Sequence, residues 1–272
     1  MSPPSMESPA LNATLVERRN ASDTHVIVKL RPDELPIRAF TPGQFLTVGL
    51  PLPARVRNAG KLELAAERTR LVKRAYSIAS SPLDTGAYEL FLAVVPGGRL
   101  TPELWKLSVG DRCWISPEAL GSFTLDNVPR DADLVLVATG TGVAPYVSML
   151  RTHSGDERWR RAALVHGACR ADDLAYREEM EDLARRDASF AYVPLVSRET
   201  GACWSGLRGR VQLALEPPLF RERAGFDLDP AAVHAFLCGN PAMIHDVRNL
   251  LAARGFAAES RHGGNVHSER YW

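Results

Sequence analysis

The stretch Arg74-Ala75-Tyr76-Ser77-Ile78-Ala79-Ser80-Ser81-Pro82 places an arginine, an aromatic residue and a hydroxyl group close together on one element. Residues that favour strands carry it to Ala79, and the proline ends it because proline cannot donate a hydrogen bond to a ladder. Alternation predicts Arg74 and Tyr76 on one face and Ser77 on the other, unless twist or a bulge re-aims them.

These residue types suit a planar cofactor with a phosphate tail. Arg74 can donate two hydrogen bonds to a pyrophosphate, Tyr76 can lie on a flat ring, and the Ser77 hydroxyl can bond a ring nitrogen at its edge. An ordinary amphipathic strand with a surface arginine would contain the same residues. The rest of the chain decides between the two interpretations.

Short strand-forming runs surround this stretch. They cover 14–18, 24–30, 44–50, 73–79, 88–95 and 111–116, with turns at 42–43, 84–86 and 97–98. Strands of this length and spacing predict an antiparallel β-barrel over residues 11–117. Within it, the segment 51–70 is too irregular to assign to strands, and we expect a long exposed loop or hairpin there.

A turn that suits a phosphate follows the fifth of these runs. The residues 101–107 predict a short helix, with Thr101 as its N-cap and Pro102 in the first helical position. The start of this helix faces the turn Gly97-Gly98-Arg99-Leu100. Backbone amides and the positive end of a helix favour an anion at this place.

From residue 133 the pattern changes to strand, glycine turn and helix. The apolar run 134–138 is typical of a parallel strand buried on both faces, and Thr139-Gly140-Thr141-Gly142 leads into a helix that reaches residue 151. Further strands are predicted at 162–168, 190–197 and 233–238, and further helices at 172–186 and 242–254. A second turn, Gly239-Asn240-Pro241, opens the last helix. This alternation predicts a doubly wound α/β domain over 131–272, with ligands at the carboxyl ends of its strands, where both turns lie.

Three arginines follow strands of this second half. Arg170, Arg198 and Arg210 would lie where the adenosine end of a dinucleotide binds. The glycine turn lacks the third glycine and the acidic residue of the full dinucleotide fingerprint, whereas guanidinium groups favour a 2′-phosphate and therefore NADP over NAD. Solvated surface arginines are the alternative for each of them.

Composition and charge exclude several classes of protein. The formal net charge of +1 does not indicate a nucleic-acid or membrane binder. The first nine residues lack the pattern of a signal peptide, and no apolar run is long enough to span a bilayer, so we expect a cytoplasmic protein. Cys113, Cys169, Cys203 and Cys238 lack the spacing of a zinc site, an iron–sulfur cluster or a disulfide framework, and no metal is expected.

Taken together, the motifs resemble the ferredoxin–NADP reductase family, and in particular its bacterial flavodoxin/ferredoxin–NADP reductases, from about residue 11 to the end. The matching motifs are R-A-Y-S at 74–77, G-G-R-L-T at 97–101, G-T-G-V-A-P at 140–145, V-S-R-E at 196–199, C-G-N-P-x-M at 238–243 and E-R-Y-W at 269–272. The segment 51–70 is longer than is usual in the bacterial enzymes.

The resemblance implies an FAD-binding barrel, an NADP-binding α/β domain and a monomer that exchanges electrons between NADPH and ferredoxin or flavodoxin. Because nicotinamide gives up a hydride and the carrier takes one electron at a time, a flavin must stand between them. The chain has no cluster ligands, so the carrier must be a separate protein. The residues implied to bind FAD are Arg74, Ala75, Tyr76, Ser77, Gly98, Arg99, Leu100, Thr101, Tyr271 and Trp272, and those implied to bind NADP are Thr139, Gly140, Thr141, Gly142, Arg170, Arg198, Arg210, Cys238 and Gly239.

The resemblance also implies catalytic roles. Tyr76 would stack on the isoalloxazine, Ser77 would bond near its N5 atom, and Cys238 would press the nicotinamide C4 towards it. Glu269 would polarise the site or relay protons, and Tyr271 would cover the flavin face opposite Tyr76. A core cysteine that ends a buried strand is the alternative for Cys238, and packing of a terminal strand on the barrel is the alternative for the last residues.

Two other functions remain open on the sequence. One is an NADH-dependent reductase component of an oxygenase, which would be expected to carry a fused cluster or haem domain. The other is a non-catalytic nucleotide-binding protein, which would purify without colour.

Overall fold

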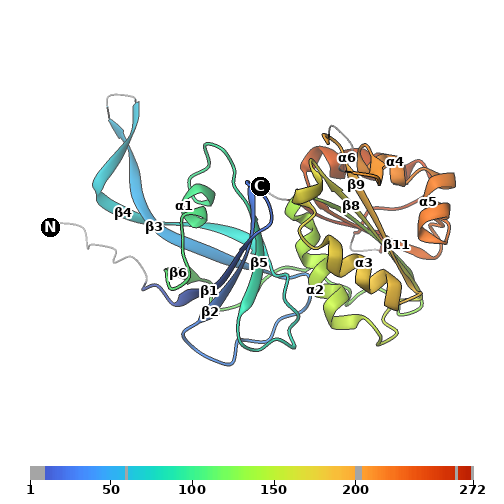
Figure 1. Ribbon diagram of the computed structural model, residues 1–272, viewed down its shortest axis with the longest axis horizontal. Coiled ribbons are helices and arrows are strands. Elements are labelled where there is room, and N and C mark those ends of the chain that lie inside the picture. Colours follow the sequence, from blue (N-terminus) through green and yellow to red (C-terminus); the bar gives the residue numbers. More distant parts are fainter. Residues whose placement is uncertain (1–9, 59–60, 200–203, 261–262, 271–272) are drawn as a thin grey trace.

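The computed structural model describes residues 10–58, 61–199, 204–260 and 263–270, and its strands form two six-stranded sheets (Figure 1). The first half of the chain forms an antiparallel sheet in the order β4-β3-β6-β1-β2-β5, and the second half forms a parallel sheet in the order β10-β9-β8-β7-β11-β12. This confirms the predicted fold class, a β-barrel followed by a doubly wound α/β domain. None of the described helices is both long and apolar enough to cross a membrane.

The antiparallel sheet closes on itself around an apolar core. A bridge between Ile78 and Leu90 joins the two end strands, and Leu15, Leu46 and Leu90 are among the buried side chains inside. The strands are β1 (Ala13–Asn20), β2 (His25–Pro32), β3 (Phe45–Asn58), β4 (Lys61–Ser77), β5 (Tyr88–Ala93) and β6 (Arg112–Ile115).

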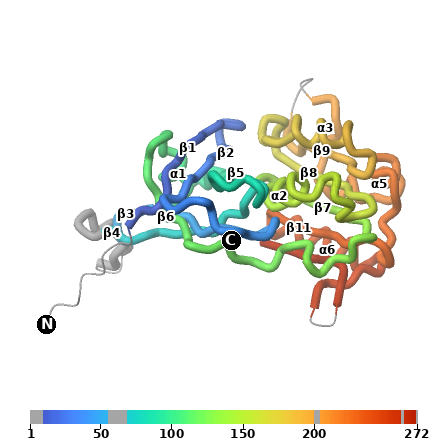
Figure 2. The backbone as a smooth tube through the Cα atoms, turned by 90° about the horizontal axis from the view of Figure 1, so that it is seen from below, coloured from blue at the N-terminus to red at the C-terminus, as the bar shows by residue number. Residues whose placement is uncertain are grey.

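Two of these strands extend past the barrel as an arm, which we define as residues 51–58 and 61–70. Cα pairing of β3 with β4 continues from Pro51–Leu71 to Asn58–Lys61, with an irregularity after Pro53. Figures 1 and 2 show the arm at the end of the barrel remote from the parallel sheet. The hairpin alternative for this segment is therefore confirmed, and the loop alternative is wrong. Beyond Gly49, β3 is no longer paired with β6, and prolines are tolerated in such edge positions.

The short helix after the barrel turn is α1 (Thr101–Trp105), and its N-cap differs from the prediction. Leu100 occupies the N-cap and makes no side-chain capping bond. The Thr101 hydroxyl accepts a hydrogen bond from the Val95 N–H at 3.0 Å, so this threonine closes the turn between β5 and α1 and does not cap the helix.

The parallel sheet is covered by helices on both faces. Helices α2 and α3 pack on one face, and α4, α5 and α6 pack on the other (Figure 1). The strands are β7 (Asp133–Thr139), β8 (Arg161–Ala168), β9 (Phe190–Val196), β10 (Leu207–Arg208), β11 (Val233–Gly239) and β12 (Val266–Arg270). The helices are α2 (Ala144–His153), α3 (Arg177–Arg186), α4 (Val211–Ala214), α5 (Pro217–Ala224) and α6 (Pro241–Ala252), with 3₁₀ turns η1 (Gly140–Val143) and η2 (Ala171–Asp173).

The predicted helix 172–186 is two separate elements, η2 and α3. The break follows from Asp173, whose carboxylate accepts hydrogen bonds from the backbone N–H of Arg170 at 3.2 Å and from the Ser22 hydroxyl of the barrel at 2.7 Å. This side chain bonds to partners outside a helix, as aspartate often does near helix starts.

The two predicted glycine turns meet at the carboxyl edge of the parallel sheet. Thr139 Oγ1 accepts a hydrogen bond from the Asn240 N–H at 3.0 Å, which joins the end of β7 to the start of α6. A Cβ atom placed on Gly142 would lie 2.2 Å from the Cys238 carbonyl oxygen, so the backbones approach as closely as only glycine allows. The turns therefore form one continuous backbone surface.

Asp133 fixes the opposite edge of the sheet. Its carboxylate is 1% exposed and accepts hydrogen bonds from Arg160 and Arg161 at 2.5–3.2 Å. Burial acts to raise the pKa of Asp133, but the bonds from the two guanidinium groups outweigh burial and lower it below the ordinary value. The ionised form is thus the one that the fold favours.

Replacing Gly142 tests the contact between the turns. We expect Gly142→Ala to cost about 1–3 kcal/mol of unfolding free energy, because the methyl group must displace backbone atoms. Gly225→Ala, at the end of α5, is the control, since its φ of 78° strains an alanine while its Cβ meets nothing within 4 Å; this strain costs about 1–2 kcal/mol. Urea unfolding and titration with NADP⁺ should show lost binding for Gly142→Ala in excess of the control. Equal binding by the two variants would contradict the interpretation.

Replacing Asp133 tests the buried ion pairs. Asp133→Asn should lose about 1.5–3 kcal/mol at neutral pH, the usual contribution of hydrogen bonds to a charged group. Because the pKa of Asp133 is lowered in the fold, this stability is present above the unfolded pKa and is lost as pH falls through the folded pKa. The wild type and the variant should therefore converge in urea unfolding at acid pH. Asp131→Asn, at an exposed neighbouring position, should change little at any pH.

Candidate functional site

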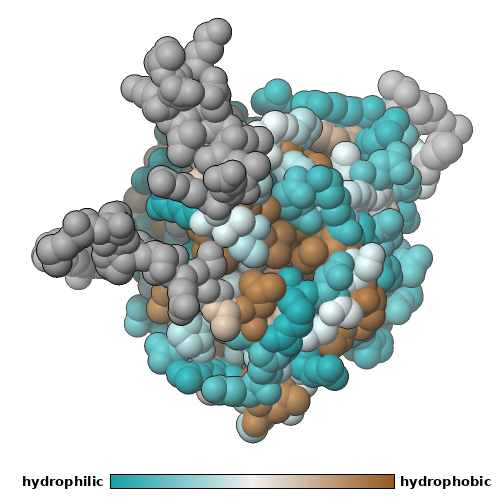
Figure 3. All heavy atoms as spheres, turned by 90° about the vertical axis from the view of Figure 1, so that its left-hand side faces the viewer, coloured by the Kyte–Doolittle hydropathy of each residue, from teal (hydrophilic) through white to brown (hydrophobic). Residues whose placement is uncertain are grey.

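A cavity of about 460 Å³ lies between the barrel and the parallel sheet. The α/β half contributes Thr141 of η1 and Arg270 at the end of β12. The barrel contributes Arg74, Ala75, Tyr76, Ser77, Phe91, Ala93, Val95, Gly98, Arg99, Leu100 and Thr101. The barrel motifs that the sequence singled out thus lie together in one place. Figure 3 views the barrel from the side of the arm, where apolar and hydrophilic residues share the surface.

Strand β4 supplies four consecutive residues of this cavity, from Arg74 to Ser77. Alternation predicts Ser77 on the other face of the strand from Arg74 and Tyr76, and all three nevertheless line this cavity. Strand β4 ends its sheet, so residues from both of its faces can line the same space. Arg74 is exposed, and its Nη1 donates to the Lys73 carbonyl at 2.7 Å.

Two features of the cavity, the Tyr76 hydroxyl and the backbone at Gly98, indicate what kind of ligand it can hold. The Tyr76 hydroxyl is buried without a hydrogen-bond partner in the described part of the chain, and burial raises the pKa of Tyr76. A buried hydroxyl in this state is costly unless a further group bonds it. At Gly98 a Cβ atom would lie 2.9 Å from the Val95 carbonyl oxygen, so the turn admits no side chain there. Together with Arg74 and Arg99, these features fit an elongated ligand with an aromatic part and an anionic part.

Arg99 also connects the cavity to the arm. Its Nη2 donates to the Pro53 carbonyl oxygen at 2.6 Å, at the base of the arm. The turn between β5 and α1 is thereby fixed against β3. The sequence placed Arg99 near a phosphate but did not indicate this second contact.

Ser77 and Glu269 form a hydrogen bond between the two halves of the chain. The Ser77 hydroxyl donates to Glu269 Oε2 at 3.2 Å, although 192 positions separate the two residues. Burial raises the pKa of Glu269, and the bond from Ser77 offsets this only in part. The carboxyl group therefore retains its proton to a higher pH than an ordinary glutamate, beside the residues that line the cavity.

The three predicted phosphate-binding arginines are exposed near the carboxyl edge of the parallel sheet. Arg170 follows β8, Arg198 follows β9, and Arg210 precedes α4. The loops of the first two are joined, because the Arg198 N–H donates to the Cys169 carbonyl at 2.9 Å. None of the three makes a salt bridge with another described residue, so their charges are available to a ligand.

Cys238 is the residue before the last of β11 and is fully buried in the apolar core. It is not among the residues that line the cavity, although its carbonyl oxygen lies where the backbones of the two glycine turns approach each other. The contact of its thiol with a nicotinamide, which the resemblance implies, stays a prediction.

The terminal aromatics Tyr271 and Trp272 lie outside the described residues. Arg270 directly before them lines the cavity, and β12, which sequence patterns did not predict, brings the chain there by pairing in parallel with β11. Four lining residues were missed: Phe91, Ala93, Val95 and Arg270. The first three alternate from β5 onward, so the two-residue period of that strand could have identified them.

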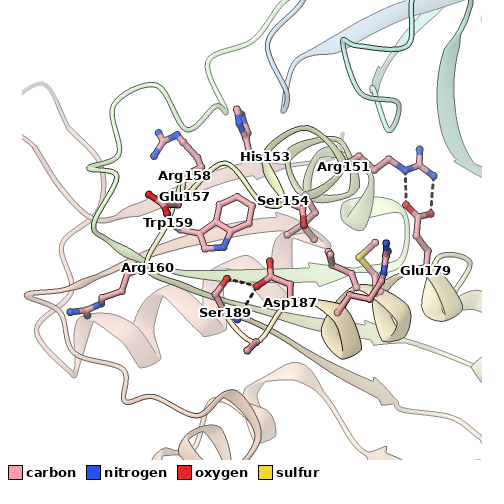
Figure 4. A pocket seen from close by; sticks show the side chains of 16 residues that line it. Arg151, His153, Ser154, Glu157, Arg158, Trp159, Arg160, Glu179, Asp187 and Ser189 are labelled. Carbon is pink, nitrogen blue, oxygen red and sulfur yellow. Dashed lines mark hydrogen bonds and ion pairs between the residues drawn. The ribbon is translucent and has the colours of Figure 1, made fainter.

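A larger cavity, of about 700 Å³, lies elsewhere on the α/β half (Figure 4). Segments that precede β8 and β9 line it, including Trp159 and Ser189, so it opens at the amino edge of the sheet. Figure 4 shows Arg151 paired with Glu179, and Ser189 bonded to Asp187. No residue that the sequence predicted for the site lines this cavity, and we assign the site to the smaller one.

Comparisons with known proteins bear on the family of the chain. Residues 136–249 match the oxidoreductase NAD-binding domain family. The chain is 35% identical over 240 residues to the flavodoxin/ferredoxin–NADP reductase of Escherichia coli (strain K12), covering 87% of this chain and 90% of the relative. It is 39% identical over 233 residues to ferredoxin–NADP reductase B of Sorangium cellulosum (strain So ce56), covering 85% of each.

A solved structure shows the same fold. The ferredoxin NADP⁺ reductase from Neisseria gonorrhoeae, crystallised with FAD and NADP, superposes with a TM-score of 0.80 at 23% identity, covering 96% of this chain and 98% of that one. The identity to the Escherichia coli relative, over most of both chains, decides the family. The chain belongs to the flavodoxin/ferredoxin–NADP reductase family, whose members are oxidoreductases.

Proposed function

We propose that this protein exchanges electrons between NADPH and ferredoxin or flavodoxin through bound FAD. The observation that carries the proposal is the single cavity to which β4 contributes Arg74 to Ser77 and η1 contributes Thr141. A strand suited to a flavin and a turn suited to a dinucleotide thus face the same space. The names of the relatives support the same reaction.

The barrel side of the cavity would hold FAD. Arg74 and Arg99 would neutralise its pyrophosphate, and the turn at Gly98, which has no room for a side chain, lets the backbone approach it. Tyr76 would pack against the ring system, and Ser77 would bond its edge. FAD, when bound, accepts a hydride from NADPH and passes electrons to the carrier one at a time.

The carboxyl edge of the parallel sheet would hold NADP. The backbone surface formed by Thr139 to Gly142 and by Gly239 would support its phosphates, and Arg170, Arg198 and Arg210 would bind the 2′-phosphate. Because these arginines are exposed and make no salt bridge with described residues, a phosphate there would not have to displace a carboxylate.

Ser77 and Glu269 would control a proton at the junction. The raised pKa of Glu269 lets its carboxyl group hold a proton where an ordinary glutamate would have lost it. Its partner, the Ser77 hydroxyl, lines the cavity, so a proton could pass between this pair and a ligand at the cavity edge. We propose that Glu269 relays protons in this way, which is one of the two roles that the resemblance implies for it.

The carrier would approach the exposed positive charges around the cavity. Arg74 and Arg270, which line the cavity, and Lys73 next to Arg74 are all exposed, so an acidic carrier would be attracted over roughly the 8–10 Å that salt leaves unscreened. The rate of carrier reduction should fall as salt is added, while the rate with a small neutral acceptor should not.

An absorption spectrum followed by kinetics with NADPH and NADH tests the proposed function. A yellow protein that NADPH reduces and that passes electrons to ferredoxin or flavodoxin supports it. A preference for NADH would favour the reductase component of an oxygenase. A colourless protein that does not take up added FAD would overturn the proposal.

Arg74→Ala should loosen FAD. The variant leaves pyrophosphate charge without its partner, which costs about 1.5–3 kcal/mol for a bond between charged groups. Lys73→Ala is the matched control, because Lys73 is the adjacent exposed cation but lies over the Trp114 ring and does not line the cavity. Dialysis followed by titration with FAD measures the affinity. Equal FAD retention by the two variants would mean that Arg74 has no such role.

Arg198→Ala and Arg210→Ala should each raise the KM for NADPH about 10- to 100-fold, the change that corresponds to one lost charge-assisted hydrogen bond. The KM for NADH, which lacks the 2′-phosphate, should hardly change. Arg185→Ala removes the same charge from an exposed position at the end of α3 and should leave both constants unaltered. Equal losses with NADPH and NADH would place the arginines away from the 2′-phosphate.

A further inference from the structure

One guanidinium group, that of Arg151, joins three elements across the boundary between the barrel and the α/β half. Its Nη1 donates to Glu89 Oε1 of β5 at 2.8 Å and to the Ala79 carbonyl at 3.1 Å. Its Nε and Nη2 donate to the two carboxylate oxygens of Glu179 on α3 at 2.6 and 2.8 Å. Arg151 lies in the last turn of α2.

The barrel partner of Arg151 is deeply buried and itself well bonded. Glu89 is 7% exposed, and the Tyr176 hydroxyl also donates to its Oε1, at 3.0 Å. The Tyr176 ring meets Phe91 edge-on, with ring centroids 5.5 Å apart. Burial acts to lower the pKa of Arg151, but Glu179 and Glu89 outweigh burial and raise it, so the arginine stays charged. Because these bonds point in different directions, they hold α2, β5 and α3 in fixed positions relative to one another at this point of the boundary.

The same face of α2 makes two further bonds to the segment that follows β4. The Ser148 hydroxyl donates to the Ser80 carbonyl at 2.7 Å, and the Thr152 and Ser81 hydroxyls lie 2.9 Å apart. Residues 148, 151 and 152 share one helix face because they are three and four positions apart. Helix α2 is thus attached directly to residues 79–81, which begin two positions after Ser77.

The residues on both sides of this attachment are close in the chain to residues of the proposed cofactor sites. Ala79 follows Ser77 by two residues, and Phe91, two residues beyond Glu89, lines the cavity. Helix α2 begins directly after η1, which carries the turn with Gly140 and Gly142. A shift of α2 against the barrel would therefore change the distance between the residues proposed to hold FAD and those proposed to hold the nicotinamide.

We propose that Arg151 is a positioning residue for the reaction: through Glu89 and Ala79 it sets the approach of the bound nicotinamide to the bound flavin. This inference rests on the proposed function. Hydride transfer needs reacting atoms roughly 3–3.5 Å apart, and a misplacement of about 1 Å can lower the rate about 100-fold. A second polar link across the boundary runs from Ser22 and His25 to Asp173. It ends on η2, so it does not fix the position of α2.

The test compares Arg151→Met, Arg151→Lys and Glu89→Gln with the control Glu179→Gln, all as FAD-loaded proteins. Glu179→Gln weakens the other ion pair of the same arginine, inside the α/β half, and leaves the bonds to the barrel intact. The readouts are the rate of flavin reduction by NADPH, the rate of reoxidation by ferricyanide, FAD content, the change in flavin absorbance on binding NADP⁺, and hydrogen exchange over 79–81 and 148–152.

We expect Arg151→Met to slow flavin reduction at least about tenfold. This is less than the roughly 100-fold fall in rate that a misplacement of about 1 Å can cause, because the other contacts across the boundary remain. Glu89→Gln should slow it less. FAD content and reoxidation should stay at wild-type values, the NADP⁺ difference spectrum should change, and exchange at the boundary should quicken. Arg151→Lys should restore part of the rate, and Glu179→Gln should behave like the wild type.

Wild-type reduction rates and difference spectra in both Arg151→Met and Glu89→Gln would overturn the inference. If Arg151→Met does not fold, Glu89→Gln, which preserves the shape of the side chain, decides the question alone. A wild-type protein that NADPH does not reduce would instead overturn the proposed function. The two failures are therefore distinguishable.

Discussion

A single apolar core runs across the boundary between the barrel and the parallel sheet, and the site depends on it. Phe91 of the barrel belongs to the same buried cluster as Leu136 and Tyr146 of the α/β half. Apolar burial supplies most of the stability of such a boundary, but it is not directional. Direction at the boundary comes instead from the hydrogen bonds around Glu89 and Arg151, because a hydrogen bond weakens steeply when its angle is distorted. Apolar burial therefore holds the barrel and the α/β half together, and the hydrogen bonds fix how the two are oriented.

The elements that the sequence predicted well are those in which local chemistry and the tertiary environment agree. The apolar run 134–138 and the turn at Gly140 to Gly142 appear where alternation and glycine placed them. The arm departs from the pattern because two prolines and an irregular register hide its two-residue period. Strand β12 was missed because a short edge strand with polar residues, such as His267, Ser268 and Glu269, carries little strand signal.

The candidate site could be predicted only where its residues are consecutive in the chain. The lining residues 74–77 and 98–101 came from motifs, but the depth of Cys238 and the partner of Ser77 depend on how distant strands meet. Arg151 shows the limit most clearly, because its partners lie 28, 62 and 72 positions away. No period or motif relates such residues, so only the packed structure brings them together.

The arm has a consequence for how copies of this protein behave towards one another. Beyond the barrel its two strands pair only with each other within the described residues, so each presents backbone groups to which a strand of another molecule could add. Two residues near the base of the arm oppose such addition, because Pro51 and Pro53 are exposed and have no N–H to donate to an added strand. Association of two copies through this segment, remote from the parallel sheet, is therefore hindered along β3.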